Sequence, residues 1–234
     1  MSLSIRYYRR VGCRRMEAVS KLDVCCLKIG DVYTSSNVNR LFEQTERTTD
    51  INNFICYTEN RSGLNSNITV KGLPSARMDQ RMWWNKVWLL DGSLHEEETI
   101  YVDLDVIVHK DLRELPKGQI VETVWFSENI SNIIHCCNIN SSVMRFKDDN
   151  FKSMYLDWLA NGEKIFKSFY GLDMWFYRRH KVMQSLFFDP KYIYSYKFGS
   201  SFPEDVEANT IRDDHVICVL DDVENKQEIL NVSS

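Results

Sequence analysis

Two aspartates separated by a single residue, Asp103 and Asp105, are the residues of this sequence best suited to carry chemistry. They follow the run TIYV at 99–102, where a buried strand would end and present both carboxylates at the edge of a sheet. Hard divalent cations bind oxygen ligands, and Mg²⁺ or Mn²⁺ commonly joins one or two carboxylates to substrate phosphates. Because another apolar run follows at once, the two charges need a partner, and a metal ion is the simplest one. A turn or a salt-bridged pair is the alternative interpretation.

Alternating strands and helices are predicted around this pair. Residues 22–29 form a nearly continuous apolar run that ends at a Gly-Asp turn, which is typical of a buried parallel strand. An amphipathic helix at 35–47 and a strand at 52–58 complete a βαβ unit. Further strands are expected at 67–73, 99–108, 122–127, 138–146 and 215–220, and further helices at 77–90, 148–160 and 173–186. This order predicts an α/β fold with a mixed, mostly parallel central sheet flanked by helices, whose strand carboxyl ends line a ligand crevice.

Composition limits the partners and the compartment. The 234 residues include 29 basic and 33 acidic side chains, and the net charge of −4 offers no overall field for nucleic acid or an anionic membrane. No apolar stretch is long enough to span a bilayer, and the N-terminus lacks the apolar core of a signal peptide, so we expect a cytoplasmic protein that is not secreted. The seven cysteines lack zinc-site spacing and are predicted to be reduced core residues.

Three segments are predicted along the chain. Residues 1–21 are rich in arginine and are interpreted as a basic N-terminal extension. Residues 22–222 are expected to form a single domain, because no glycine- or proline-rich linker and no repeat divides them. Residues 223–234 are interpreted as a C-terminal tail.

In their order and spacing, several segments of residues 22–222 resemble nucleotide-sugar glycosyltransferases of the GT-A fold, in particular family 8 and its small bacterial relatives. The resemblance rests on VCCLKIGDVY (24–33), WWNKVWLL (83–90), YVDLDVIV (101–108), NINSSVMRF (138–146), YGLDMWF (170–176) and SYK (195–197). It implies a single Rossmann-like GT-A domain. It also implies transfer of a hexose or deoxyhexose from a nucleoside diphosphate sugar, UDP-linked, to a hydroxyl of a glycan or glycoprotein. Similarity to family 8 favours retention of the anomeric configuration.

A narrower resemblance is to the amino-terminal transferase domain of the capsid-glycosylating enzymes of large algal (chlorella) viruses. It implies protein glycosylation in the host cytoplasm, with a viral capsid glycan as the acceptor. Under that interpretation the chain is one domain of a longer polypeptide.

The resemblance implies a metal site at the paired aspartates. Asp103 and Asp105, with Leu104 between them, would bind Mn²⁺ or Mg²⁺, and the ion would neutralise the nucleoside diphosphate as it leaves. Family members usually supply a third ligand from a His-Gly pair near the C-terminus, where this chain reads VICVLDDVE. By alignment Asp221 takes the position of that histidine, and a carboxylate suits a hard ion. The alternatives for this third ligand are Asp222 and His215.

Several polar residues of the matching motifs are the donor contacts that the resemblance implies, namely Lys28, Tyr33, Asn85, Lys86, Asn140 and Lys197. The turn after the first strand would receive the base and ribose, because a tyrosine can stack on a base. The segment with Asn85 and Lys86 would face the phosphates or the donor sugar, because a lysine adds positive charge to a diphosphate. The residues leave other interpretations open: Tyr33 packed on the core, Lys28 at a solvated strand end, and Asn140 in a polar edge strand.

Asp173 is the candidate catalytic residue. It follows Tyr170-Gly171-Leu172 and precedes an aromatic helix, where an aspartate is also a favourable helix cap. In an inverting enzyme a carboxylate must take the proton of the acceptor hydroxyl, whereas in a retaining enzyme Asp173 would orient donor and acceptor. The tryptophans at 83, 84 and 88 are expected to lie in the core rather than to form a substrate platform.

Two other function classes match parts of the sequence. A sugar-phosphate nucleotidyltransferase shares the architecture and the use of Mg²⁺, but it needs a glycine-rich loop with a basic residue after the first strand, and LKIGDVY does not provide one. A catalytically degenerate, glycan-binding module is consistent with the altered C-terminal metal position. Metal-dependent binding of a nucleoside diphosphate separates this module from the two enzyme classes.

Overall fold

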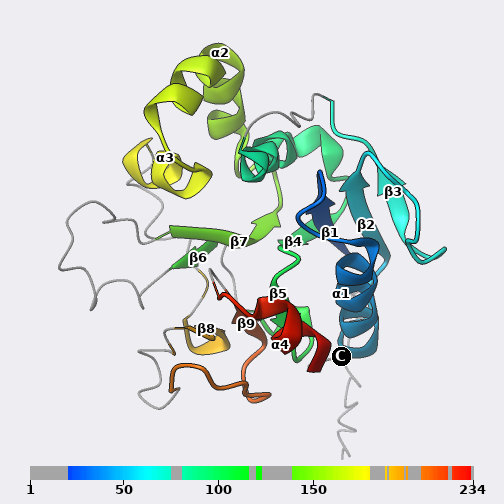
Figure 1. The fold of residues 1–234 in the computed structure, drawn as a ribbon. Helices are drawn as coiled ribbons and strands as arrows, with labels where there is room; N and C mark the ends of the chain where they lie inside the picture. The colour runs from blue at the N-terminus through cyan, green and yellow to red at the C-terminus, as the bar shows by residue number, and fades with distance from the viewer. Residues whose placement is uncertain are drawn as a thin grey trace, which may run out of the picture.

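The computed structural model describes residues 21–74, 81–115, 120–122, 139–179, 188, 190–197, 199, 207–220 and 223–232. In this part of the chain a six-stranded sheet of order β3-β2-β1-β4-β7-β6 forms the centre, and a three-stranded sheet of order β5-β9-β8 lies beside it (Figure 1). The strands are β1 (Leu22–Lys28), β2 (Asn53–Thr58), β3 (Thr69–Lys71), β4 (Glu98–Val102), β5 (Val106–Val108), β6 (Ile120–Glu122), β7 (Ile139–Phe146), β8 (Ile193–Ser195) and β9 (Ile217–Val219). The α-helices are α1 (Ser35–Thr48), α2 (Lys152–Ser168), α3 (Leu172–Arg179) and α4 (Lys226–Val232), and the 3₁₀ helices are η1 (Met82–Leu90), η2 (Gly92–Leu94), η3 (Leu112–Glu114) and η7 (Pro190–Tyr192).

The pairing of the strands confirms the mixed, mostly parallel central sheet predicted from the sequence. Strand β1 pairs in parallel with β2 and with β4, and β2 pairs in parallel with β3. Strand β7 pairs antiparallel with β4 and with β6. Because β1 and β4 are adjacent and parallel, their carboxyl ends open at the same edge of the sheet, next to the middle of β7.

Helices cover both faces of the central sheet, and its inner strands β1 and β4 are buried along almost their whole length. Successive side chains of β1 point to opposite faces. Cys26 packs with Val38 and Leu41 of α1 in one apolar cluster. Cys25 packs in a second cluster with aromatic side chains of η1, α2 and α3, including Trp84. In Figure 1, α1 lies on one side of the sheet, and α2 and α3 lie on the other. The continuous apolar run at 22–29 is explained by this double burial.

The β-prone run 99–108 is not one strand but two, and the first ends at TIYV, the strand end predicted before the aspartates. Strand β4 ends at Val102 and β5 begins at Val106, in a different sheet. Between them the amide of Asp103 donates to the carbonyl of Ser142 at 2.8 Å, and the amide of Val106 donates to the carbonyl of Asp103 at 3.3 Å. The chain therefore turns at the two aspartates, and β5 continues into an antiparallel pair with β9.

Two other elements differ from the sequence prediction. The helix expected at 77–90 is a 3₁₀ helix over Met82–Leu90 rather than an α-helix, and residues 75–80 lie outside the described residues. Helix α2 begins at Lys152 and continues to Ser168, beyond the predicted end at residue 160. Residues 123–127 of the strand expected at 122–127 lie outside the described part of the chain, as do residues 180–186 of the last predicted helix.

The segment interpreted as a C-terminal tail contains helix α4. Leu230 is fully buried, and Ile229 nearly so, in an apolar cluster with Ile107, Tyr194 and Cys218 of the smaller sheet. Packing of these two side chains holds α4 against β5, β8 and β9, beside the turn after β4 (Figure 1). None of the helices in the described ranges has the length and apolar character needed to cross a membrane. The cysteines at 25, 26, 56 and 218 are free thiols and buried, as predicted for core residues.

Candidate active site

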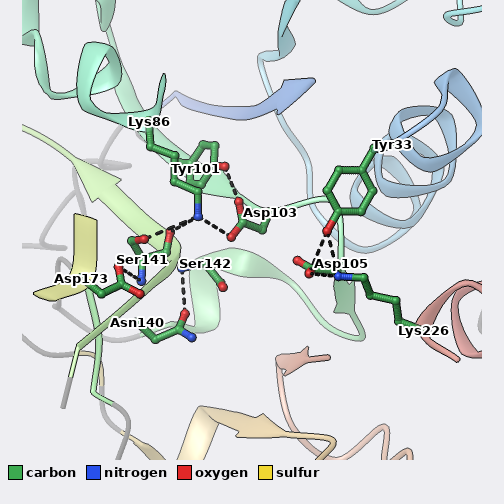
Figure 2. Close-up of polar contacts among 10 residues, drawn as sticks. All are labelled: Tyr33, Lys86, Tyr101, Asp103, Asp105, Asn140, Ser141, Ser142, Asp173 and Lys226. Atoms are coloured by element: carbon green, nitrogen blue, oxygen red, sulfur yellow. Dashed lines mark hydrogen bonds and ion pairs between the residues drawn. The ribbon is translucent and has the colours of Figure 1, made fainter. Parts of the chain in front are cut away.

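Asp103 lies directly after β4 and is held by two neighbouring side chains (Figure 2). Its Oδ2 accepts a hydrogen bond from Lys86 Nζ at 2.5 Å, and its Oδ1 accepts one from the hydroxyl of Tyr101. Burial raises the pKa of Asp103 against the opposing effect of Lys86. Burial lowers the pKa of Lys86, but the charges of Asp103, Asp173 and Asp105, together with the hydrogen bond to Asp103, outweigh it and the net shift is upward. The two groups are therefore a charged pair in a mostly dry environment.

Asp105 gathers two further groups from distant parts of the chain. Its Oδ2 accepts from Tyr33 Oη at 2.9 Å and from Lys226 Nζ at 3.1 Å. Lys226 Nζ also lies 3.2 Å from Tyr33 Oη, so the three side chains form a closed triangle (Figure 2). Tyr33 comes from the turn after β1 and Lys226 from the first residue of α4. Both partners bind the same oxygen of Asp105, Oδ2.

A second branch of the site leads from Lys86 to Asp173. Lys86 Nζ lies 3.5 Å from both the carbonyl oxygen and the Oγ of Ser141, and the amide of Ser141 donates to Asp173 Oδ1 at 3.1 Å. The carboxylate of Asp173 thus contacts strand β7 rather than only capping its own helix. Burial raises the pKa of Asp173, while Lys86 and Ser141 oppose that rise. Asn140 lies on the same strand, and its Oδ1 accepts from the amide of Ser142 at 2.8 Å.

Arg40 of α1 fixes the backbone of the turn that carries the two aspartates. Its Nη2 donates to the carbonyl of Leu104 at 2.7 Å, and its Nη1 donates to the carbonyl of Val106 at 3.1 Å. Burial lowers the pKa of Arg40 to about 10, although the charge of Asp105 opposes this. A guanidinium remains charged at neutral pH with this pKa, so it is a buried cation behind the aspartates.

Sequence reasoning missed three residues of the site. The signal for Tyr101 was its position two residues before Asp103 on a strand, which puts both side chains on one face. The signal for Arg40 was a charged residue on the buried face of a helix, one position before Leu41. Lys226 was missed because residues 223–234 were interpreted as a tail, and no local pattern connects it with Asp105.

The turn after β1 depends on Gly30. Its φ is +69°, and a Cβ at this position would lie 2.3 Å from Met82 Sδ. The amide of Gly30 donates to Glu59 Oε1 at 2.8 Å, which ties the turn to the segment after β2. Only glycine has both the backbone freedom and the space for this turn, which leads the chain from β1 to Tyr33.

The structure brings together six residues predicted for the site, which are Tyr33, Lys86, Asp103, Asp105, Asn140 and Asp173 (Figure 2). Two others contact the backbone of their own segments. Lys28 Nζ donates to the carbonyl of Gly30 at 3.3 Å, and Asn85 Nδ2 donates to the carbonyl of Met82 at 2.9 Å. The side chain of Leu104 is buried in the core, and Lys197 is exposed in the turn after β8.

The expected third metal ligand, Asp221, lies outside the described residues, and so does Asp222. The chain nevertheless reaches the site just before them, because the amide of Leu220 donates to the carbonyl of Asp105 at 3.1 Å. His215 lies at the opposite end of β9, next to the His109 end of β5, where the amide of His109 donates to the carbonyl of Val216. The register of β9 therefore argues against His215 as a ligand.

The donor chemistry of the turn matches a hard divalent cation. Asp103 and Asp105 offer carboxylate oxygens, which Mg²⁺ and Mn²⁺ prefer. Among the described residues no group of three or more His, Cys, Asp or Glu side chains could hold an ion. Mg²⁺ is commonly bound through one or two carboxylates plus substrate phosphates, so two protein ligands are sufficient when a diphosphate completes the shell.

A separate cavity of about 680 Å³ lies at the other end of the central sheet. It is lined by Glu98, the first residue of β4, and by His95, Phe146 and Asp149 among others. In open α/β sheets ligands bind outside the carboxyl ends of the strands. The position of Asp103 and Asp105 after the last residue of β4 satisfies this rule, and the cavity at Glu98 does not.

The fold is similar to that of solved glycosyltransferases. The glycosyltransferase GlyE of Streptococcus pneumoniae TIGR4 matches with a TM-score of 0.60 at 11% identity, over 91% of this chain and 60% of GlyE. A glycosyltransferase involved in the glycosylation of the major capsid of PBCV-1 matches with a TM-score of 0.55 at 11% identity, over 91% of this chain and 99% of that protein. An active-site mutant of LgtC matches with a TM-score of 0.50 at 13% identity, over 90% of this chain and 95% of LgtC.

These structures define the class to which the fold belongs. The chain has the GT-A glycosyltransferase fold, as the order and spacing of its motifs predicted. It spans 60% of the length of GlyE and nearly the whole length of the PBCV-1 protein and LgtC. No protein-family model matches the sequence, and no curated protein matches it either.

Proposed function

We propose that this protein is a metal-dependent glycosyltransferase that moves a hexose or deoxyhexose from a UDP-sugar to a hydroxyl of a glycan or glycoprotein. The observation that carries the proposal is the position of Asp103 and Asp105 in the turn after β4, each held against a lysine from another segment. In the GT-A fold this edge of the sheet is where a nucleotide-sugar would bind. A capsid glycan as the acceptor is the narrower form of the same proposal, supported by the likeness to the PBCV-1 protein.

In this reaction the two lysines would neutralise part of the negative charge of the nucleoside diphosphate. Asp103 and Asp105 would hold the Mn²⁺ or Mg²⁺ ion, and Lys86 and Lys226, which lie at these carboxylates, would add positive charge for the diphosphate. A lysine is a compact positive charge that binds phosphate well. Tyr33 lies beside Lys226 on the β1 side of the turn, and its half-buried ring, which packs against the apolar core, is proposed to receive the base and ribose. Asp221, which follows the Leu220 contact to Asp105, is proposed as the third protein ligand.

The transfer step breaks the bond between the anomeric carbon and the phosphate oxygen, and its electron pair leaves on the diphosphate. A new bond forms between the anomeric carbon and the acceptor oxygen, and the acceptor hydroxyl loses its proton. A divalent ion, when bound, stabilises the negative charge of the leaving diphosphate. In an inverting reaction Asp173 takes the acceptor proton, for which its raised pKa is favourable. In a retaining reaction the departing diphosphate oxygen takes the acceptor proton and the carboxylate of Asp173 orients donor and acceptor, so the anomeric configuration of the product distinguishes the two roles.

Calorimetric titration tests the proposal. UDP and GDP are titrated with and without Mn²⁺, followed by their sugar conjugates, and hydrolysis of each conjugate is measured in the same samples. We expect micromolar UDP binding, about −8 kcal/mol, that requires Mn²⁺. The double variant Asp103→Ala/Asp105→Ala should lose this binding. A control with the exposed pair Glu96→Ala/Glu97→Ala, at the other end of β4, should retain it.

Each outcome of this titration has a definite meaning. The sugar conjugate that is hydrolysed fastest identifies the donor. Absence of nucleotide binding with every divalent metal contradicts the proposal and favours a degenerate, glycan-binding relative. Nucleotide binding that persists in the aspartate variant moves the metal site away from the turn after β4.

A further inference from the structure

Two aromatic side chains remain exposed beside the candidate active site. Trp83 is 44% exposed and Tyr170 is 68% exposed, whereas the other aromatic side chains whose burial the structure describes are buried or half-buried. The two rings contact each other, with centroids 5.9 Å apart and planes tilted by 43°. Large exposed aromatic surfaces of this kind mark interaction sites more often than scattered single residues do.

The exposed pair is held in place from behind. Arg81 donates to the carbonyl of Tyr170 and, at 2.9 Å, to the carbonyl of Phe166, and its guanidinium lies 4.6 Å from the ring centroid of Phe166. The indole Nε1 of Trp84 donates to the same Tyr170 carbonyl at 3.3 Å. These bonds fix the backbone beneath an exposed ring, so a ligand that stacks on it would lose little conformational entropy on binding.

The pair is also close to the donor site. Trp83 is three residues before Lys86 on η1, and in a 3₁₀ helix such side chains eclipse each other with a separation of roughly 6 Å along the axis. Tyr170 is three residues before Asp173, so at most about 10 Å of chain separates them. Lys86 and Asp173 themselves meet at Ser141. The aromatic pair therefore lies next to the side chains at which the sugar is proposed to be transferred.

The chemistry of the pair suits a sugar ring. A pyranose presents C–H groups on its faces and hydroxyl groups at its rim. Aromatic faces carry a partial negative charge that attracts the C–H face, and the indole N–H and the phenol O–H are donors for the rim. We propose that Trp83 and Tyr170 form the acceptor subsite and stack on a pyranose ring of a glycan acceptor. This inference rests on the proposed transferase function, in which the nucleotide base lies on the other side of Asp103, near Tyr33.

Saturation-transfer NMR on the full chain tests the subsite. The probes are methyl β-galactopyranoside, methyl α-mannopyranoside, lactose and maltose. For at least one of them, we expect saturation of the C–H face by wild-type protein and about a tenfold rise in Kd, equal to about 1.4 kcal/mol, in Trp83→Ala and in Tyr170→Ala. Trp83→Phe keeps an aromatic face and should retain most of the affinity. The control Leu156→Ala/Leu159→Ala removes exposed apolar side chains of α2 and should leave sugar binding unchanged.

Binding of UDP with Mn²⁺, measured on the same variants, separates this inference from the proposed function. Unchanged UDP affinity together with weakened sugar binding supports the acceptor subsite and also excludes misfolding. Sugar binding to the aromatic pair in a protein that binds no UDP supports the subsite while contradicting the transferase. Sugar affinity that does not change in either alanine variant overturns the subsite, as does the absence of saturation transfer to all probes at about 10 mM in wild type. Loss of UDP binding with retained sugar binding also overturns it, because the pair would then stack on the nucleotide base.

Discussion

Replacing Lys86 with methionine is the perturbation that tests the electrostatics of the site most directly. Methionine keeps the volume of the apolar stem but removes the ammonium that lies 2.5 Å from Asp103 Oδ2. The two side chains are only 11% and 17% exposed, so the carboxylate is left without its cation in a mostly dry environment. Removing one partner of a buried pair costs about 3 to 5 kcal/mol. Because Tyr101 still donates to Asp103, we expect a loss near the lower end, about 3 kcal/mol.

Urea denaturation and thermal melts measure this loss. For a chain of this size, about 3 kcal/mol corresponds to a fall in Tm of roughly 6 to 12 °C. Added Mn²⁺ should raise the Tm of Lys86→Met more than that of wild type, because no ammonium then competes for Asp103. The control Lys147→Met removes an exposed partner of Glu98 and should leave the Tm unchanged.

Two results would refute this reasoning. A loss below about 1 kcal/mol would mean that the pair is solvated like a surface ion pair. An equal response of wild type and Lys86→Met to Mn²⁺ would mean that Lys86 and the ion do not share Asp103.

Three further predictions follow from individual contacts. Arg40→Met should lower the free energy of unfolding in urea by about 3 kcal/mol, because the buried carbonyls of Leu104 and Val106 lose their donor. An unchanged free energy of unfolding would contradict the proposed role of Arg40 in fixing this turn. Asp173→Asn should lower kcat for sugar transfer by at least about a hundredfold and leave the Kd for UDP unchanged; an equal loss of UDP affinity would instead assign it to donor binding. The pKa of Asp214 should be about 2 by NMR titration, mainly because Arg212 hydrogen-bonds to it, and should return toward 3.8 in Arg212→Gln. Because the folded pKa is depressed, this stabilisation is present above pH 3.8 and is lost as the pH falls through 2; no change in pKa on substitution would exclude Arg212 as the cause.

Most of the central sheet could be predicted from sequence, because its strands and α1 have patterns that depend on local burial. The runs at 22–29 and 138–146 became β1 and β7, and the helix expected at 35–47 became α1. The pair Asp103 and Asp105 was found by its position after an apolar strand, and it does lie at the carboxyl end of β4. Lys86 was identified through the family resemblance, and its ion pair with Asp103 spans 17 residues.

Local pattern could not predict how the strands on the two sides of the aspartates would pair. Residues 99–102 and 106–108 both have strand propensity, and only the pairing shows that they belong to different sheets, with β4 beside β1 and β5 beside β9. The run WWNKVWLL has apolar residues at a spacing that fits a helix, and this spacing did not distinguish an α-helix from the 3₁₀ helix that packs against the aromatic side chains of α2 and α3. Trp84 confirms the prediction of a core tryptophan, but Trp83, which follows the same pattern, is exposed.

By itself, the sequence determined the α/β class of the fold, the mixed sheet and the carboxylate pair at its edge. These depend on the periodicity of apolar residues and on the chemistry of residues close together in the chain. Only the tertiary structure decided which groups neutralise that pair. Lys226 lies 121 residues after Asp105 and reaches it because Ile229 and Leu230 of α4 are buried against the smaller sheet. Such a contact depends on how two packed elements fit together, which no window of sequence around either residue contains.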